Sequence, residues 1–293
     1  MISVAAFYRF TPIDAPGALK TQLAAALCPL GVRGTLLVAP EGINGTLAAE
    51  HDALMQAMAL LRQIPGCEAL TWKESRADKM PFGRLKVRLK KEIVTMGRPE
   101  VDPNAAVGRR IAPEAWNAVL DDPDTVVIDT RNDYEVAIGS FDGAIDPRTV
   151  SFGAFPRWWE ENAEHFAGKR VAMFCTGGIR CEKSTSFLVG QGVEDVVHLD
   201  GGILAYLEKV PEAESRWHGG CFVFDERVAV GHGVEPTDHT LCHGCRRPLT
   251  PEDLSHPDYE EGVSCHRCAG ETSEADKARY RDRQRQRAAA KTG

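Results

Sequence analysis

The sequence predicts a multidomain protein in which an α+β domain is followed by an α/β domain and a small cysteine-rich module. Strand-like and helix-like segments follow one another without strict alternation in residues 1–97, whereas short apolar strands alternate regularly with helices in residues 113–212. Two C-x2-C pairs then lie in residues 213–273, a segment with few apolar residues. A chain of 293 residues has room for two or three domains of ordinary size.

Composition and charge restrict the classes of function. The hydrophobic content of 43% is typical of a globular protein, and no run approaches the roughly 20 uncharged apolar residues of a membrane helix. The first positive charge follows an apolar run, the reverse of a signal peptide, so we expect a cytoplasmic protein without a membrane partner. There, nine cysteines suggest metal binding or catalysis rather than disulfides. The net charge of −7 combines basic ends with an acidic middle, which excludes a uniform nucleic-acid coating but leaves two local basic surfaces.

The first 97 residues are expected to contain four strands and two helices. The helices are indicated by apolar residues at helical spacing, and the last strand by strict alternation of charged and apolar residues. A turn is predicted at residues 40–45, where Asn44-Gly45 is first a tight-turn sequence and only second a substrate-contacting loop. The elements are the strand 3–10, helix 16–27, strand 32–39, strand 46–48, helix 51–63 and strand 84–93. This βαββαβ order predicts a ferredoxin-like, or acylphosphatase-like, sandwich.

Residues 97–113 hold two Gly, three Pro and mixed charge, and we therefore predict a linker at residues 98–112. The domain at 113–212 is expected to contain a parallel sheet, because its strands alternate with helices. Its elements are the helix 113–120, strand 125–128, helix 157–166, strand 170–174, helix 181–191, strand 196–199 and helix 203–208. After the Cys-rich module, residues 274–293 form a basic segment without apolar anchors, helical or disordered, which we expect to be flexible.

The segment around Cys175 carries the clearest chemical indication in the chain. An apolar strand delivers Cys175 to the carboxyl edge of the sheet, where open α/β folds bind ligands. Gly177 and Gly178 let successive N–H groups turn inward, and a helix starts near Cys181. With the fixed charge of Arg180, these groups favour a thiolate and predict a lowered pKa for Cys175. The alternative is a buried cysteine followed by a helix-capping turn, which the Gly pair and the Arg disfavour.

The pattern Cys175-x-x-Gly178-x-Arg180 resembles the active loop of rhodanese-like proteins. Three further stretches, at 127–135, 138–147 and 198–206, agree with that family in the same order. Cysteine phosphatases of this fold have five residues between Cys and Arg, whereas this loop has four. These four are Thr176, Gly177, Gly178 and Ile179. The smaller cradle favours sulfur or persulfide chemistry over phosphoryl transfer.

Other residues of this region remain open between two roles. Cys181 is either a thiol that resolves an oxidised or persulfidated Cys175 or a small hydrophobic residue in the first helical turn. Asp129, Arg131 and Glu135 are expected to be structural and to hold the turn after the first strand of the domain.

The whole chain is similar to one bacterial family, the oxygen-dependent tRNA uridine hydroxylases that convert the wobble uridine to 5-hydroxyuridine. The residues that carry this resemblance are APEGINGT at 39–46, TRNDYE at 130–135, CTGGIRCEK at 175–183 and CFVFDERVAV at 221–230. The resemblance implies a tRNA substrate, molecular oxygen as co-substrate, an essential Cys175 and an N-terminal domain that helps to hold RNA. The residues themselves show no flavin or nicotinamide glycine fingerprint and no cluster typical of a non-haem iron site.

Two alternative functions follow from the residues alone. Without the resemblance, the loop predicts a sulfurtransferase that acts on thiosulfate or a persulfide. A non-catalytic RNA- or protein-binding module that keeps a rhodanese shell is the third reading, which the presence of Cys175, Gly178 and Arg180 together disfavours. The oligomeric state, the electron donor and the set of substrate tRNAs are not indicated by the sequence.

Four cations alternate with apolar residues along the strand predicted at 84–93. Because successive side chains of a strand face opposite sides, Arg84, Lys86, Arg88 and Lys90 share one face. The row contains no carboxylate and lies in a basic part of the chain, which favours contact with RNA phosphates over a merely solvated face. Arginines of the last segment (279, 281, 283, 285 and 287) are further candidates for RNA contact.

Two C-x2-C pairs predict a structural zinc site with four thiolate ligands. Cys242 and Cys245 are separated from Cys265 and Cys268 by 19 residues, a spacing typical of tetrahedral zinc. A metal would stabilise a segment that has too few apolar residues for a core of its own. Redox dithiols or functionless cysteines are the alternatives. The other three cysteines, Cys28, Cys67 and Cys221, are expected to be structural.

Overall fold

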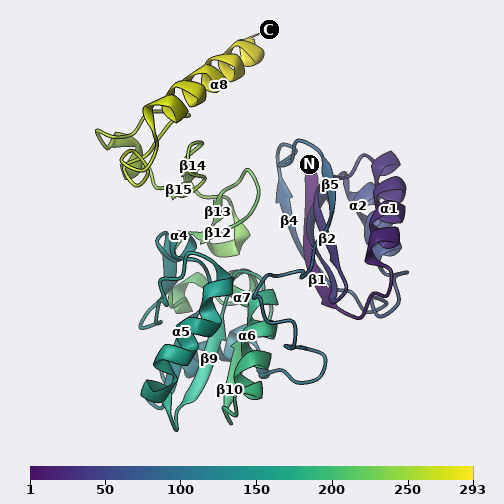
Figure 1. Cartoon of the computed structure of the whole chain (residues 1–293), viewed down its shortest axis with the longest axis vertical. Helices are drawn as coiled ribbons and strands as arrows, with labels where there is room; N and C mark the ends of the chain where they lie inside the picture. Colours follow the sequence, from purple (N-terminus) through teal and green to yellow (C-terminus); the bar gives the residue numbers. More distant parts are fainter. Residues whose placement is uncertain (293) are drawn as a thin grey trace.

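The computed structural model describes residues 1–292, with the side chains of residues 1–286. Figure 1 shows three parts: an N-terminal domain in purple and blue, a central domain in teal and green, and a C-terminal module that ends in a long yellow helix. No helix of the described residues combines the length and the hydrophobicity needed to cross a bilayer.

The N-terminal domain has one five-stranded sheet with two helices on one face (Figure 1). Its core lies between the helices and the sheet and includes Leu36, Ile43, Leu54 and Met58. The strand order is β4-β1-β3-β2-β5, in which β5 runs parallel to β2 and the other pairs are antiparallel. The elements are β1 (Ile2–Phe10), α1 (Pro16–Leu27), a 3₁₀ turn (Cys28–Leu30), β2 (Arg33–Ala39), β3 (Gly42–Ala49), α2 (His51–Leu61), β4 (Lys73–Ala77) and β5 (Leu85–Leu89). The predicted ferredoxin-like sandwich is confirmed.

The structure corrects two local predictions in this domain. The strand expected at residues 84–93 forms as the shorter β5, but β5 is an additional strand at the edge, and the last strand of the ferredoxin-like order is β4. The expected turn at residues 40–45 is shorter, because Asn44 and Gly45 lie inside β3. At Gly45 a Cβ atom would stand 2.7 Å from the carbonyl oxygen of Thr35, so this glycine permits close strand packing rather than a turn.

The central domain is built on a four-stranded parallel sheet of order β6-β10-β9-β7, as predicted. Its strands are β6 (Arg109–Ile111), β7 (Thr125–Asp129), β9 (Arg170–Phe174) and β10 (Val196–Leu199), with the separate strand β8 (Gly139–Phe141). Its helices are α3 (Trp116–Leu120), α4 (Asp133–Val136), α5 (Phe155–Asn162), α6 (Ile179–Gly190) and α7 (Gly202–Lys209), with 3₁₀ turns at Pro113–Ala115, Phe152–Ala154, Ala163–Phe166 and Glu212–Glu214. Strand β6 lies within the expected linker, so this segment also supplies one edge of the sheet.

The C-terminal module begins as an extension of the central domain. Strand β11 (Trp217–Gly219) pairs with β8, and Trp217, Cys221 and Val230 belong to the core of the central domain. Two hairpins follow, β12–β13 and β14–β15, and the module ends in α8. The bounds are β12 (Cys221–Phe222), β13 (Ala229–Val230), β14 (Thr240–Leu241), β15 (Pro248–Leu249) and α8 (Glu274–Thr292), with 3₁₀ turns at His232–Val234 and Glu252–Ser255.

Helix α8 is held to the Cys-rich module by polar contacts. Arg281 forms two hydrogen bonds of 2.6 Å with the carboxylate of Glu260, and Arg283 donates to the carbonyl oxygen of His243 at 2.7 Å. The predicted segment is therefore helical, and its flexibility stays a prediction. The side chain of Arg287 lies outside the described residues.

A buried lysine joins the central domain to the N-terminal part of the chain. Lys183 of α6 is fully buried, and its ammonium group lies 2.8 Å from a carboxylate oxygen of Glu41. It also binds the carboxylate of Glu92 and the carbonyl oxygen of Val94, the latter at 3.1 Å. A buried charge needs such partners, and all three come from the segment that precedes the central domain. Helix α6 is thereby fixed against the N-terminal domain.

Candidate active site

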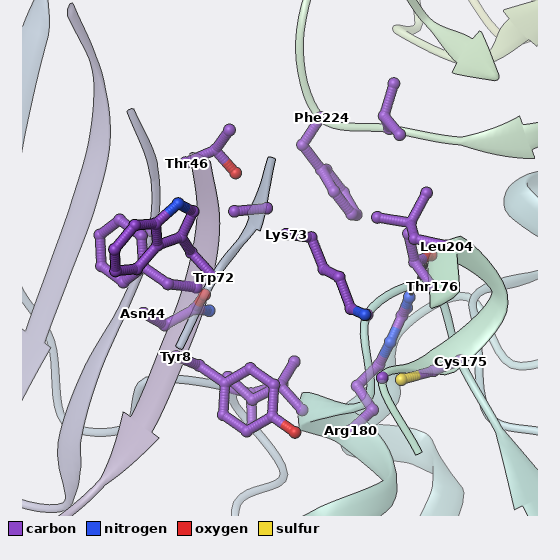
Figure 2. Close-up of a pocket in the computed structure, with 18 of the residues that line it drawn as sticks. Tyr8, Asn44, Thr46, Trp72, Lys73, Cys175, Thr176, Arg180, Leu204 and Phe224 are labelled. Atoms are coloured by element: carbon purple, nitrogen blue, oxygen red, sulfur yellow. Dashed lines mark hydrogen bonds between the residues drawn. The ribbon is translucent and has the colours of Figure 1, made fainter. Parts of the chain in front are cut away.

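A cleft of about 950 Å³ lies between the two domains (Figure 2). One wall is the face of the N-terminal sheet that the helices leave uncovered, and the other contains the Cys175 loop. A third part comes from the loop between β12 and β13. Among the lining residues are Tyr8, Asn44, Thr46, Trp72, Lys73, Cys175, Thr176, Arg180, Leu204 and Phe224. Three distant segments of the chain therefore form one site.

Cys175 directly follows β9 at the carboxyl edge of the sheet and is fully buried at the base of this cleft. The amide of Gly178 donates a hydrogen bond of 3.1 Å to its Sγ atom. Burial alone would raise the pKa of Cys175. The hydrogen bond from the Cys181 thiol, the charge of Arg180 and the amides of both residues outweigh burial and lower this pKa to about 6. This direction favours the thiolate, the form that the loop sequence leads us to expect.

The pKa of Cys181 is shifted in the opposite direction. It is fully buried, and burial together with the hydrogen bond to Cys175 raises its pKa well above the ordinary value. Its Sγ atom also lies 3.8 Å from the hydroxyl oxygen of Thr130. The neutral Cys181 thiol is therefore a donor that stabilises the Cys175 thiolate, so the structure brings the two predicted thiols together.

Glycines allow the loop to take this shape. Gly178 has a φ of +97°, and a Cβ atom there would stand 3.0 Å from the hydroxyl oxygen of Tyr8. At Gly202, a Cβ would stand 2.4 Å from the carbonyl oxygen of Cys175. Because Gly202 has no side chain, the first turn of α7 can approach and donate the amide of Ile203 to that carbonyl at 2.9 Å. Backbone hydrogen bonds from the first turn of α7 therefore fix the loop.

Arg180 reaches the site through a buried ion pair that the sequence did not indicate. Its guanidinium group forms two hydrogen bonds of 2.7 and 2.8 Å with Glu135, and a third of 3.2 Å with the hydroxyl of Thr176. Burial opposes the ionisation of Glu135, but Arg180 lowers the pKa of this carboxyl below its ordinary value. Asp129 and Arg131 form a second buried ion pair. The structural role of Glu135 is therefore to orient the guanidinium group of Arg180.

A hydrogen-bond network beside the loop is a second feature that the sequence did not indicate. Tyr8 of β1 donates to the carboxylate of Glu182 at 3.2 Å, and Arg110 binds the same carboxylate at 2.7 and 2.8 Å. Burial, and then the charges of Glu182 and Cys175, raise the pKa of Tyr8 well above its ordinary value. Tyr8 and Glu182 are 174 positions apart, so no local pattern could have joined them.

The predicted basic strand lies at the edge of the cleft-facing sheet surface. In the register of β2 and β5, Thr35 pairs with Lys86 and Leu37 with Arg88. Thr35 and Leu37 line the cleft, so the side chains of Lys86 and Arg88 continue the same face and are exposed. Arg84 and Lys90, on either side of β5, are also exposed. These four exposed cations, Arg84, Lys86, Arg88 and Lys90, therefore form a cationic border that extends from the cleft.

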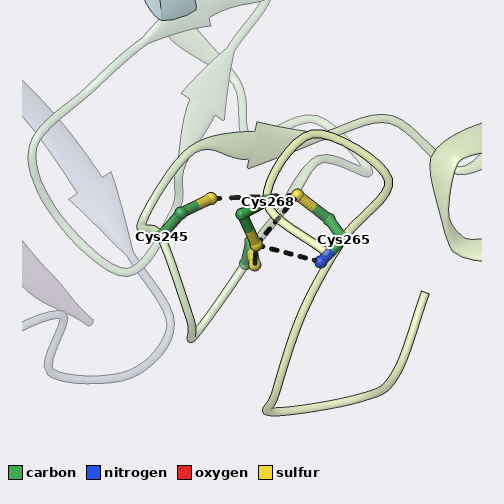
Figure 3. A group of neighbouring side chains, drawn as sticks. Cys245, Cys265 and Cys268 are labelled. Carbon is green, nitrogen blue, oxygen red and sulfur yellow. Dashed lines mark hydrogen bonds between the residues drawn. The ribbon is translucent and has the colours of Figure 1, made fainter. Parts of the chain in front are cut away.

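The four late cysteines converge in the C-terminal module (Figure 3). Their sulfur atoms all lie within 4.8 Å of one another, and the Cys242–Cys268, Cys245–Cys265 and Cys265–Cys268 pairs are 3.8 Å apart. Four thiolates around a tetrahedral zinc at about 2.3 Å would be about 3.8 Å apart, so the donor set fits this ion. None of the four lines the cleft, so the cluster is separate from the Cys175 site.

Comparisons with known proteins cover nearly the whole chain. Residues 2–93 match the family described as "UPF0176 acylphosphatase like domain", and residues 112–209 match "Rhodanese-like domain". A protein of Ruegeria pomeroyi named tRNA uridine(34) hydroxylase is 60% identical over 99% of this chain and 97% of its own length. Proteins of the same name from Roseobacter denitrificans and Caulobacter vibrioides are each 56% identical, over 98% and 97% of this chain and 97% and 92% of their own lengths.

Proposed function

Because the chain belongs to the tRNA uridine(34) hydroxylase family, we propose that it hydroxylates the wobble uridine of tRNA at C5 in the cytosol. The observation that carries the proposal is the Cys175 thiolate at the base of a cleft bordered by a row of cations. A thiolate can attack an electron-poor ring such as uracil, and the cations suit the phosphates on either side of the target nucleotide.

Molecular oxygen is the proposed co-substrate: one of its atoms is added to C5 of the base, and the other leaves as water with two protons and two electrons from an external two-electron reductant. In this role Cys175 is the nucleophile, the amide of Gly178 and Arg180 stabilise its negative charge, and Glu135 holds Arg180 in place. The loop alone would favour sulfur transfer, whereas the shared name of the relatives favours hydroxylation. Cys181 is proposed to act with Cys175, as its hydrogen-bond donor and as a resolving thiol if Cys175 is oxidised.

The Cys-rich module is proposed to hold a structural zinc ion. Cys242, Cys245, Cys265 and Cys268 would be its ligands, and the ion would supply the folding energy of a segment whose own apolar cluster is small. This ion has no part in the chemistry, because its ligands are not in the cleft.

The test is mass spectrometry of tRNA nucleosides from a strain that lacks this protein. Loss of 5-hydroxyuridine derivatives, restored by the intact chain, is the expected result, and labelled oxygen gas should place its isotope in the product. Loss of thiolated nucleosides instead would favour a sulfurtransferase, and an unchanged nucleoside profile would favour a binding module.

A further inference from the structure

Phe224 is an aromatic residue that the fold leaves exposed at the rim of the cleft. Four large hydrophobic residues are exposed among the described residues: Met1, Leu89, Val150 and Phe224. Phe224 alone of these is aromatic and alone lines the cleft, with 62% of its surface accessible. Figure 2 shows its ring reaching from the 223–227 loop into the pocket toward Lys73 and Leu204. An apolar ring left in water at a binding site indicates a partner that covers it.

The ring is held in place before any partner arrives. It packs edge-to-face on Phe222, with ring centres 5.1 Å apart, and Phe222 packs in the same way on Tyr134 at 5.4 Å. The loop itself is pinned by Arg227, which binds the buried carboxylate of Asp225 and donates to the hydroxyl of Ser75 at 2.7 Å. An aromatic surface held in this way loses little conformational entropy when a ligand stacks on it.

The surroundings of Phe224 fit a nucleotide better than an apolar peptide. Lys73 lies beside it in the cleft and keeps about a third of its side chain exposed, and Trp72 belongs to the opposite wall. The cationic border of β5 continues from the same sheet face. A planar base needs an aromatic face, and its phosphates need cations, which is the combination found in single-stranded nucleic-acid sites.

We propose that Phe224 is a stacking platform for the anticodon-loop base next to the target uridine. The proposal rests on the tRNA-directed function given above and adds the subsite that holds the substrate while the uridine reaches Cys175. Because Cys175 lies at the fully buried base of the cleft and Phe224 at its rim, the uridine must leave its stack to react. Phe224 stabilises the base that stays behind.

The test uses an anticodon stem-loop RNA that carries the fluorescent base 2-aminopurine next to the wobble uridine. The full chain with Cys175→Ser should bind this RNA without turnover and quench the fluorescence by stacking. Adding Phe224→Ala should abolish most of the quenching and weaken binding on the order of 10-fold, the effect of losing one stacked base. Phe224→Trp should retain both, and Val150→Ala, which removes an exposed apolar side chain outside the cleft, should change neither.

A hydroxylation assay separates this inference from the proposed function. With Cys175 intact, Phe224→Ala should raise the KM for tRNA and leave kcat nearly unchanged. Suppose that the unmodified chain hydroxylates tRNA, and that the Phe224→Ala variant has the same RNA affinity and the same fluorescence quenching as the chain that keeps Phe224. The stacking role is then wrong, while the proposed function stands. If the unmodified chain binds no tRNA and modifies none, the proposed function itself is wrong. Equal melting temperatures of the variants exclude a folding defect.

Discussion

Two physical effects act in opposite directions on the pKa of Cys175: burial raises it, and the hydrogen-bond donors and the positive charge around the sulfur lower it. Complete burial disfavours a charged sulfur, yet the hydrogen bond from the Cys181 thiol, the charge of Arg180 and the amides of both residues together lower the pKa of Cys175 to about 6. The favourable groups are fixed by the backbone or by buried ion pairs, so they need no rearrangement to stabilise the charge. The thiolate is therefore a property of the folded loop.

Cys175→Ser should abolish modification of tRNA while the protein remains folded. Serine is close in size to cysteine but is not ionised near neutral pH. In the unmodified enzyme, kcat/KM should fall as the pH decreases through about 6, because the thiolate becomes protonated, and should be level at higher pH. Nucleoside analysis after complementation and a pH–rate profile measure the two effects. A folded Cys175→Ser protein with full activity would show that Cys175 is not the nucleophile.

Substitutions of Arg180 and of Glu135 should shift the acid limb of the kcat/KM–pH profile in opposite directions. Arg180→Met removes the positive charge and should shift the limb to higher pH. Glu135→Gln removes the neutralising charge and should shift it to lower pH, with a loss of about 3–5 kcal/mol of stability because the buried Arg180 loses its partner. Alkylation of Cys175, followed by mass spectrometry across a pH series, reports the thiol directly. Identical limbs in both variants would mean that Arg180 does not act on Cys175.

At the scale of the secondary-structure elements, β5 carries two exposed cations, Lys86 and Arg88, that form no ion pair within the described part of the chain. Replacing Lys86 and Arg88 by Gln should weaken tRNA binding and reduce the slope of log K against log salt by roughly 0.7–0.9 for each lost phosphate contact. The matched control removes Arg157 and Lys169, two exposed cations that do not border the cleft. Filter binding at several salt concentrations gives the slopes. Equal slopes for both variants would identify β5 as a solvated edge.

Helix α6 serves two sites at once, since Arg180 faces the cleft and Lys183 the domain junction. Lys183→Met should leave Glu41 and Glu92 as unpaired carboxylates and loosen the junction. The triple variant, with Lys183→Met, Glu41→Gln and Glu92→Gln, should recover much of the lost stability, because no buried charge then lacks a partner. Small-angle scattering should show an expanded molecule only for the single variant. A compact, fully active single variant would show that the lysine does not position the domains.

A helix or strand could be predicted from the sequence when its own residues carry the pattern typical of that element. Strands β9 and β10 are buried apolar runs, and their predicted bounds are those of the structure. Strand β4 has the sequence KESRA, without an apolar alternation, and it is a strand only because β1 offers it an edge. Strand β6 has three residues and depends in the same way on pairing with β10. Tertiary context thus decided the elements that the sequence did not indicate.

At the scale of the whole molecule, the cleft is an assembly of parts from the entire chain. The Cys175 loop could be predicted because a strand, two glycines and an arginine are adjacent in sequence. Tyr8, Lys73 and Phe224 could not, because their contribution depends on how the N-terminal sheet and the β12–β13 loop meet that loop. The junction that brings them together is fixed in part by Lys183.

The zinc site should control the folding of the segment that holds the four late cysteines. Purified protein should contain about one zinc per chain, measurable by elemental analysis. Removing it should unfold the module around Cys242 and Cys265 and release α8, because the partners of Arg281 and Arg283 lie on that module. Limited proteolysis before and after chelation reports this change, and melting of the N-terminal domain serves as an internal control. A metal-free protein whose module resists protease would contradict the prediction.

The complete burial of Cys175 has a consequence for the working life of the protein. A low-pKa thiolate is the form that peroxide attacks most readily, and over-oxidation beyond the sulfenic state is irreversible for most proteins. Here the Cys175 side chain has no surface accessible to solvent, although the residue lines the cleft. We expect this burial to slow the reaction of the sulfur with peroxide, and we expect binding of a substrate to expose the sulfur. Inactivation by peroxide should accordingly proceed faster during turnover than at rest.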